Sequence, residues 1–169
     1  MVVERTIKVK LTQLLKAFPV VTVTGCRQCG KSTLLRHLLP GYIYISLEDL
    51  DVRQMAEEDP RHFISVYSKN VIIDEIQRVP GLLSYIQTHV DSINEAGMYV
   101  LTGSHNLLLM ESISQSLAGR TGLLTLAPFS VEELRKSKLL PKTTNEMLYY
   151  GSFPRIYDKH IEPSDFYPS

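Results

Sequence analysis

The sequence has few cysteines, no long apolar run and no excess of either charge, and each absence excludes a class of protein. Its two cysteines lie three positions apart, at Cys26 and Cys29, so they cannot build a disulfide scaffold. No stretch has the length of apolar residues that a membrane span needs, and the opening MVVERTIKVK lacks the apolar core of a signal peptide. We therefore expect a cytoplasmic protein without a membrane partner.

The overall charge gives no indication of a nucleic-acid partner. Eighteen basic side chains balance eighteen acidic ones, so neither nucleic acid nor an anionic membrane is favoured by net charge. A chain of 169 residues with 44% hydrophobic content is long enough to bury a core and corresponds to about one domain. We find no internal repeat and no low-complexity segment.

The apolar pattern that is present predicts an α/β fold. Short apolar runs alternate with longer segments of helical period, which is typical of a parallel sheet covered by helices on both faces. The predicted strands are Val20–Thr24, Tyr42–Ser46, Val71–Asp74, Met98–Thr102 and Leu123–Leu126. The predicted helices are Ser32–Leu39, Leu50–Glu58, Pro60–Ser68, Gly81–Glu95, Asn106–Leu117 and Val131–Lys138.

The chain changes character after Pro128, where prolines begin to punctuate a tyrosine-containing tail. Turn and breaker residues throughout this tail argue against strand. We interpret residues 1–130 as the compact core and residues 131–169 as a helical or irregular appendage.

The stretch GCRQCGKST, from Gly25 to Thr33, follows a predicted strand and precedes a predicted helix, which is the context of a phosphate-binding loop. Gly25 and Gly30 let the backbone turn its N–H groups around a phosphate, and the following helix directs its positive dipole end at the same anion. Lys31 is placed to reach the β and γ phosphates, and Ser32 to offer its hydroxyl to Mg²⁺. The predicted nucleotide-binding residues are Gly25, Cys26, Arg27, Gln28, Cys29, Gly30, Lys31, Ser32 and Thr33.

The same letters also contain a C-x-x-C pair, which is found in zinc and redox sites. A zinc site needs four ligands, and the five histidines are scattered without a second pair of ligands at suitable spacing. A redox reading leaves the Gly-Lys-Ser sequence unexplained. We therefore interpret the cysteines mainly as loop residues, and leave open that an oxidant could block the site through them.

A second motif, NVIIDEI, ends a predicted buried strand in two carboxylates, Asp74 and Glu75. The carboxyl ends of strands face the crevice where an open α/β sheet binds ligands. Asp74 is suited to hold Mg²⁺ through its water shell, and Glu75 to accept a proton from an attacking water. Two solvated acids at a strand end are the simpler alternative.

Further candidates lie in two later segments of the chain. Thr102, Ser104 or Asn106 could orient the attacking water or contact the γ phosphate, and among them we favour Ser104. Arg120, after the helix stop in SLAGR, could complete the transition state in its own subunit or in a neighbouring one. A salt bridge to a carboxylate is an equally good interpretation of Arg120.

These residues resemble a known family. The stretches GCRQCGKST, VIIDE, LTGSHNLLL, SLAGR and LAPFSVEEL occur in an order and spacing similar to bacterial and archaeal AAA-superfamily ATPases that join an N-terminal P-loop domain to a C-terminal domain. The resemblance covers nearly the whole chain, and SLAGR combined with PFS and the later GSFP is its most specific part. Gly151-Ser152 departs from the two expected glycines, and the chain ends at Ser169, about where the second domain should begin.

The resemblance implies ATP binding and hydrolysis by a P-loop NTPase fold. This fold is a three-layer α/β/α sandwich with a mostly parallel, five-stranded sheet of the additional-strand type. It implies that Lys31, Ser32 and Asp74 lie at the nucleotide and metal, with Glu75 as the base. ATP, ADP and Mg²⁺ are the expected ligands, a homo-oligomer is left open, and the macromolecular client is not indicated.

Two other functions share the phosphate loop. A small-molecule kinase would need a phosphate acceptor site, whereas Asp74-Glu75 favours water as the acceptor. A nucleotide-dependent switch with little turnover would let ATP hold one conformation or assembly state. Adenine is the default base because we find no Asn-Lys-x-Asp signal for guanine.

Overall fold

A five-stranded, all-parallel sheet forms the centre of the molecule in a computed structural model, which describes residues 3–104, 111, 113 and 115–167. The strand order is β2-β3-β4-β1-β5. The bounds are β1 Val20–Gly25, β2 Ile43–Ser46, β3 Val71–Asp74, β4 Tyr99–Ser104 and β5 Thr121–Thr125. Because β4 lies between β1 and β3, the sheet is of the additional-strand type that the sequence predicts, and it is wholly rather than mostly parallel.

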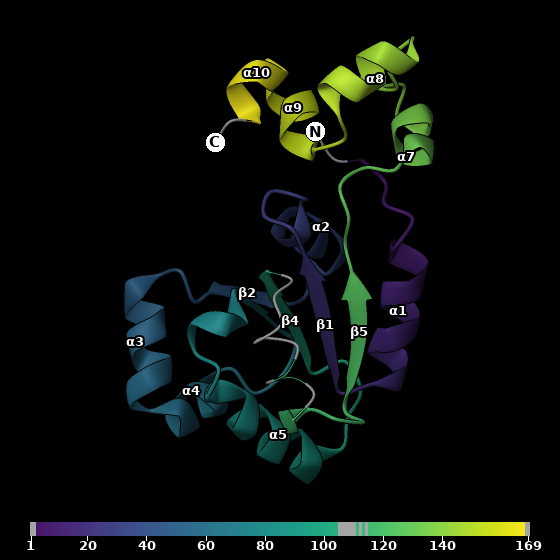
Figure 1. Cartoon of the computed structure of the whole chain (residues 1–169). Coiled ribbons are helices and arrows are strands. Elements are labelled where there is room, and N and C mark those ends of the chain that lie inside the picture. Colours follow the sequence, from purple (N-terminus) through teal and green to yellow (C-terminus); the bar gives the residue numbers. More distant parts are fainter. Residues whose placement is uncertain (1–2, 105–110, 112, 114, 168–169) are drawn as a thin grey trace.

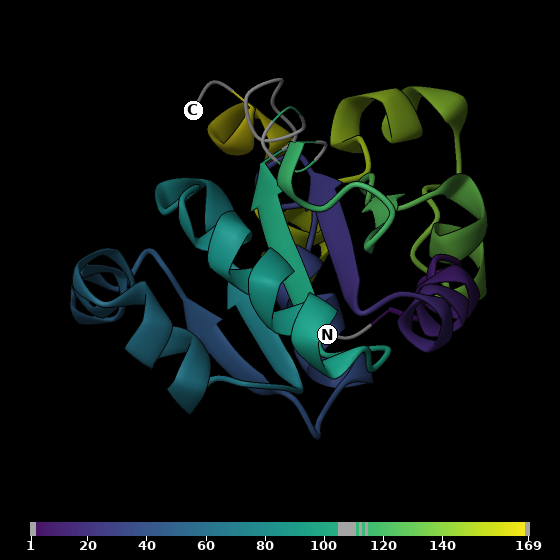
Figure 2. The ribbon, with the colours of Figure 1, turned by 90° about the horizontal axis from the view of Figure 1, so that it is seen from below.

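Helices cover both faces of this sheet (Figures 1 and 2). One face packs against α3 (Leu50–Glu58), α4 (Pro60–Val66) and α5 (Leu82–Ile93), and the other against α1 (Lys8–Ala17) and α2 (Lys31–Leu38). A short 3-10 helix, η1 (Ile76–Arg78), follows β3. The predicted three-layer α/β/α sandwich is therefore confirmed. Within the described ranges, no helix combines the length and apolar character required to cross a membrane.

The sheet divides the core into two hydrophobic clusters by the alternation of side chains along each strand. In β3, Val71 and Ile73 pack with α3, α4 and α5, whereas Ile72 packs on the side of α1 and α2. All three are fully buried, so β3 reads as a continuous apolar run, as a strand covered on both faces should. Slippage by one residue would exchange the two sets of side chains, which fixes the register of β3 against its neighbours.

The structure confirms the five predicted strands and differs at some ends. β5 begins at Thr121 rather than Leu123, and β4 continues to Ser104 rather than stopping at Thr102. Helix α1 was not predicted, although Leu11 and Leu14 give it a buried stripe. Much of the predicted helix Asn106–Leu117 lies outside the described residues. Within this range, residues 111, 113, 115 and 116 are described and helical.

The segment after β5 crosses the carboxyl edge of the sheet as a group of short helices (Figure 1). These are α7 Val131–Lys136, α8 Thr144–Tyr150, α9 Pro154–Lys159 and α10 Pro163–Phe166. A third hydrophobic cluster joins Val3 from the start of the chain to Phe129 and Leu134, with Met147 and Tyr157 packed against it. Val3 thus packs against the segment that follows β5, at the edge of the sheet that carries the phosphate loop.

Candidate nucleotide-binding site

The phosphate loop connects the central strand β1 to α2, at the carboxyl edge of the sheet. A side chain at Gly25 would place its Cβ 2.3 Å from the Leu126 carbonyl oxygen of the neighbouring strand's extension, so this position has no room for one. Gly30, which precedes α2, has φ 96°, a left-handed conformation that side chains rarely adopt. Glycine is therefore required at Gly25 because another backbone lies close, and at Gly30 because the backbone is left-handed.

The Lys31 side chain lies across this loop. Its ammonium donates to the carbonyl oxygens of Gly25 at 2.9 Å and Cys26 at 3.0 Å, and the residue is only 6% exposed. Lys31 also lines the cavity above the loop. The positive charge is thus held at the floor of the cavity by two neutral acceptors, which a phosphate oxygen would outcompete as a charged acceptor.

Asp74, at the end of β3, receives hydroxyl groups from three directions. Ser32 Oγ donates to its Oδ2 at 2.8 Å, and the Tyr44 and Thr102 hydroxyls donate to the same carboxylate. Burial, together with the hydrogen bond to Asp74, raises the pKa of Tyr44 to about 12, so this phenol stays protonated and donating. The loop serine and the strand-end aspartate that the sequence assigned to Mg²⁺ are therefore in direct contact.

Glu75 begins the turn after β3 and lines the same cavity. Its backbone is left-handed, with φ 58° and ψ 47°, and its N–H donates to Thr102 Oγ1 at 3.3 Å. The Gln77 amide donates to its carboxylate. This conformation turns Glu75 away from the line of β3, so that Asp74 and Glu75 do not share one direction.

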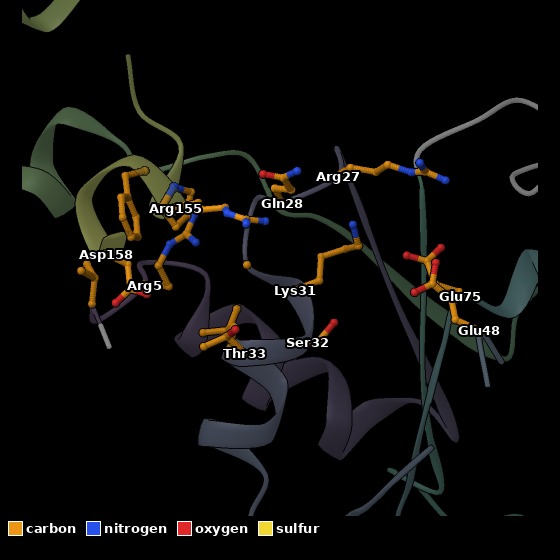
Figure 3. A pocket seen from close by; sticks show the side chains of 15 residues that line it. Arg5, Arg27, Gln28, Lys31, Ser32, Thr33, Glu48, Glu75, Arg155 and Asp158 are labelled. Carbon is orange, nitrogen blue, oxygen red and sulfur yellow. The ribbon is translucent and has the colours of Figure 1, made fainter. Parts of the chain in front are cut away.

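The cavity has a volume of about 490 Å³, within the range of small-molecule sites. Figure 3 shows Arg5 and Arg155 on one side of Lys31, and Glu48 and Glu75 on the other. An apolar wall completes the lining, formed by Val3, Phe129 and Pro154. Pro154 of α9 lies over the phosphate loop, 3.7 Å from where a Cβ at Gly30 would be, so the appendage covers the loop directly.

Sequence reasoning missed Arg5, which is 6% exposed and ties the site together. Its guanidinium donates to the carbonyl oxygens of Cys29 in the phosphate loop at 3.2 Å and Ala127 at 2.6 Å. It also lies 3.1 Å from Glu133 Oε2 of α7 and stacks over Phe129, 4.9 Å from the ring centre. Burial favours the neutral form of Glu133, but the N–H groups of Ser130 and Thr6 and the charge of Arg5 outweigh it and lower its pKa.

The two remaining predicted residues take different places. Ser104 ends β4 opposite Gly25 in the register of β1, so it lies at the edge that carries the phosphate loop; Asn106 lies outside the described residues. Arg120 lies at the other edge, since its carbonyl accepts from the N–H of Val20, the first residue of β1. The five steps from Val20 to Gly25 span about 16 Å at ~3.3 Å per residue.

The structure therefore does not bring Arg120 to the cavity of its own chain. Instead, its guanidinium pairs with Asp91 of α5, with Nη2 donating to Oδ2 at 2.8 Å and Nε donating to Oδ1. The hydrogen bond from Arg120 lowers the pKa of Asp91. Of the two interpretations of Arg120, the salt bridge to a carboxylate is the one seen within this chain.

A family profile described as "AAA domain" matches residues 17–135, well over half of the chain. The chain belongs to this family. The AAA domain match runs from the last residue of α1 into α7 and includes the phosphate loop, the Asp74-Glu75 pair and Glu133. The resemblance drawn from the motifs is thereby confirmed.

Two curated relatives and two solved structures resemble this AAA domain. Uncharacterized protein Mb2031c of Mycobacterium bovis and Rv2008c of Mycobacterium tuberculosis are each 33% identical over 131 residues, covering 76% of this chain and 29% of the relative. The chain thus spans less than a third of their length. The Walker-type ATPase PABY2304 of Pyrococcus abyssi aligns with a TM-score of 0.63 at 21% identity, covering 92% of this chain and 65% of that one. AMPPCP-bound DnaA of Aquifex aeolicus gives 0.58 at 16%, covering 95% and 59%. These two structures share the P-loop ATPase fold.

Proposed function

We propose that this AAA domain binds ATP and hydrolyses it to ADP and phosphate with Mg²⁺. The observation that carries the proposal is the 2.8 Å contact between Ser32 of the phosphate loop and Asp74 of β3, next to Lys31 at the floor of a cavity of nucleotide size. A hydroxyl and a carboxylate in contact offer oxygen ligands, which Mg²⁺ prefers. The residues present therefore fit the metal that the family implies.

The positions of the side chains support the proposed phosphate-binding roles. Lys31 exchanges its loop carbonyls for phosphate oxygens, and the loop N–H groups and the start of α2 bind the same anion. Mg²⁺, when bound, would neutralise charge that develops on the phosphates. Among the described residues there is no cluster of three or more His, Cys, Asp or Glu side chains, so such an ion would take most ligands from nucleotide and water.

Glu75 is the proposed general base. It lines the cavity on the side opposite Arg155, one residue beyond the carboxylate assigned to the metal (Figure 3). Its carboxylate would accept the proton of the attacking water, and Ser104, at the same sheet edge, would help to orient that water.

The apolar wall of Val3, Phe129 and Pro154 is the proposed contact surface for the adenine ring. A flat aromatic base buries its faces against such side chains, while the phosphates extend toward Lys31. AMPPCP is the ligand named for the DnaA structure, which shares this fold. Adenine is proposed here on that likeness and on the absence of a guanine motif in the sequence.

The test is Mg²⁺-dependent phosphate release from ATP by the wild-type chain, Glu75→Gln and Glu48→Gln. Glu48 is the matched control, because it lines the same cavity and pairs with Arg78 at 3.7 Å. We expect Glu75→Gln to bind ATP and lose at least 100-fold in turnover, while Glu48→Gln keeps most of its activity. Equal activity of Glu75→Gln and wild type would contradict the base assignment.

One observation favours a second function, a nucleotide-dependent switch with little turnover. The Gln77 amide already donates to the Glu75 carboxylate, so the base is engaged within its own turn. A chain that binds ATP tightly, releases almost no phosphate and changes its assembly state with nucleotide would be such a switch.

A further inference from the structure

We propose that Cys26 and Cys29 form a dithiol modification site, in which a small-molecule disulfide such as glutathione disulfide converts them to an intramolecular disulfide that closes the nucleotide site. The closure rests on the proposed function, whereas formation of the disulfide does not. Both cysteines are free thiols in the phosphate-binding loop, and the proposed hydrolysis assigns no chemical step to either sulfur.

The turn in the loop brings the backbones of the two cysteines close together. Arg27 and Gln28 form a turn between the cysteines, with Gln28 at φ 63°. The ends of a β-turn lie within about 7 Å of each other, and a disulfide needs Cα atoms roughly 4.4–6.8 Å apart. After burial, which is the largest cause, the neighbouring Cys26 thiol also contributes to the raised pKa of Cys29.

The two thiols differ in access, which sets the order of reaction. Cys26 is exposed, whereas Cys29 is fully buried. Burial raises the pKa of the Cys29 thiol to about 11, so little of it is thiolate at neutral pH. Because the thiolate is the nucleophile, Cys26 reacts first.

The chemistry balances in two exchange steps. The Cys26 thiolate attacks glutathione disulfide, which forms a Cys26–glutathione mixed disulfide and releases one glutathione. Cys29 then loses its proton and attacks the Cys26 sulfur, forming the Cys26–Cys29 bond and releasing the second glutathione. The protein dithiol is oxidised by two electrons, and one glutathione disulfide is reduced to two thiols.

The new bond would disturb three contacts that shape the loop. The Cys29 sulfur now fills the space beneath Gly25, 3.0 Å from where a Cβ would be, and would have to leave it to reach Cys26. The Cys29 carbonyl accepts from Arg5, and the Cys26 carbonyl accepts from Lys31. Movement of these groups turns the loop N–H groups away from a bound phosphate.

The experiment incubates the reduced chain with glutathione disulfide and follows two separate readouts. Mass spectrometry of the intact chain and of its peptides should show the loss of two hydrogens, located to the peptide that contains Cys26 and Cys29. ATP affinity, measured by titration, should fall at least tenfold and return after reduction with dithiothreitol. By linkage, ATP should then disfavour the disulfide by the same factor, a shift of about 30 mV for a two-electron couple.

Two variants separate the steps. Cys29→Ser should stop at a glutathione adduct on Cys26. Cys26→Ser should gain no disulfide, and its ATP affinity should be the same before and after treatment. Two free thiols after prolonged treatment, or a disulfide form that binds ATP as the reduced form does, would overturn the inference. A reduced chain that binds no nucleotide would instead overturn the proposed function and the closure with it, even where the disulfide forms.

Discussion

At the residue scale, the two loop glycines differ in what a substitution would disturb. Gly25→Ala places a methyl group against the Leu126 carbonyl oxygen, so either β1 or the chain after β5 must shift. We expect a loss of roughly 2 kcal/mol or more in the free energy of unfolding, and loss of ATP binding. Gly41→Ala is the control, because nothing lies within 4 Å of its added Cβ. Thermal unfolding and ATP titration of both variants check this, and equal behaviour of the two would contradict it.

The buried Arg5–Glu133 pair predicts a stability effect that depends on pH. The side chains are 6% and 4% exposed, so Glu133→Gln leaves an uncompensated buried cation and should cost roughly 3 kcal/mol at pH 7. The folded-state pKa of Glu133 is lowered, so its contribution is complete above its unfolded pKa of about 4.3 and declines as the pH falls below it.

Urea unfolding of wild type and Glu133→Gln at pH 7 and near pH 3.5 would measure this difference. The gap between the two should narrow at the lower pH. Glu132→Gln, on the exposed face of the same helix, should change little at either pH. A gap that stays constant with pH would show that the stabilisation does not come from the charge of Glu133.

Residue identity alone predicted part of the site. The phosphate loop and Asp74-Glu75 are contiguous motifs, so the sequence carries them directly. Arg5 comes before the first strand in the sequence and Glu133 after the last one, so no local sequence pattern predicts their contact. Tyr44 and Thr102 lie within predicted strands, but which strand faces Asp74 depends on the strand order.

At the element scale, chain order determines which edge of the sheet a residue occupies. In a parallel sheet, residues that follow a strand lie at its carboxyl edge and residues that precede a strand lie at its amino edge. Ser104 is the last residue of β4 and lies at the edge of the phosphate loop, whereas Arg120 precedes β5 and lies at the far edge. The predicted strands alone are enough to assign these two edges. They put Arg120 at the edge opposite the phosphate loop of its own chain.

Helix α1 shows where periodicity was present but not strong enough to predict a helix. Leu11 and Leu14 are buried at helical spacing, yet the residue before the helix, Ile7, offers no side-chain cap, and the helix carries several lysines. Its end is clearer, since Phe18 precedes Pro19 and adopts an extended conformation. The buried side chains of α1 pack on β1 and β5, so their role is recognisable only when the positions of these two strands are known.

Helix α9 contributes a testable contact from the appendage. Arg155 lines the cavity on the side of Arg5 (Figure 3). Helix α9 begins at Pro154, directly over the phosphate loop. We expect Arg155→Ala to weaken ATP binding about tenfold, because a charged hydrogen bond to phosphate is worth roughly 1.5 kcal/mol or more. Lys159→Ala, on the same helix but outside the cavity lining, is the control. Equal affinities of the two variants would show that α9 does not contact the nucleotide.

At the scale of the whole molecule, the position of Arg120 decides in which subunit it could act in catalysis. Arg120 lies beside the first residue of β1, too far from the phosphate loop at the other end of that strand to reach phosphates in its own chain. A catalytic Arg120 must therefore act on a neighbouring copy. We expect Arg120→Ala and Glu75→Gln to be inactive alone and to recover activity when mixed, because the Arg120→Ala site would receive the arginine of its neighbour.

Phosphate release from the mixture, measured against total protein concentration, checks this prediction. Activity that rises with concentration in the mixture, and in the wild type, supports an assembly with a shared site. Full activity of Arg120→Ala by itself would leave Arg120 with the structural role that its pairing with Asp91 describes.

The third hydrophobic cluster has a consequence for synthesis on the ribosome. Val3, a member of this cluster, is among the first residues to emerge, but Pro154 and Arg155, which line the same cavity, are made after the entire sheet. At about 5–20 residues per second, an interval on the order of ten seconds separates the phosphate loop from the helix that covers it. During synthesis the phosphate loop is therefore present while the cavity above it is still incomplete. A nucleotide could contact the phosphate loop before Pro154 is available to contact its base.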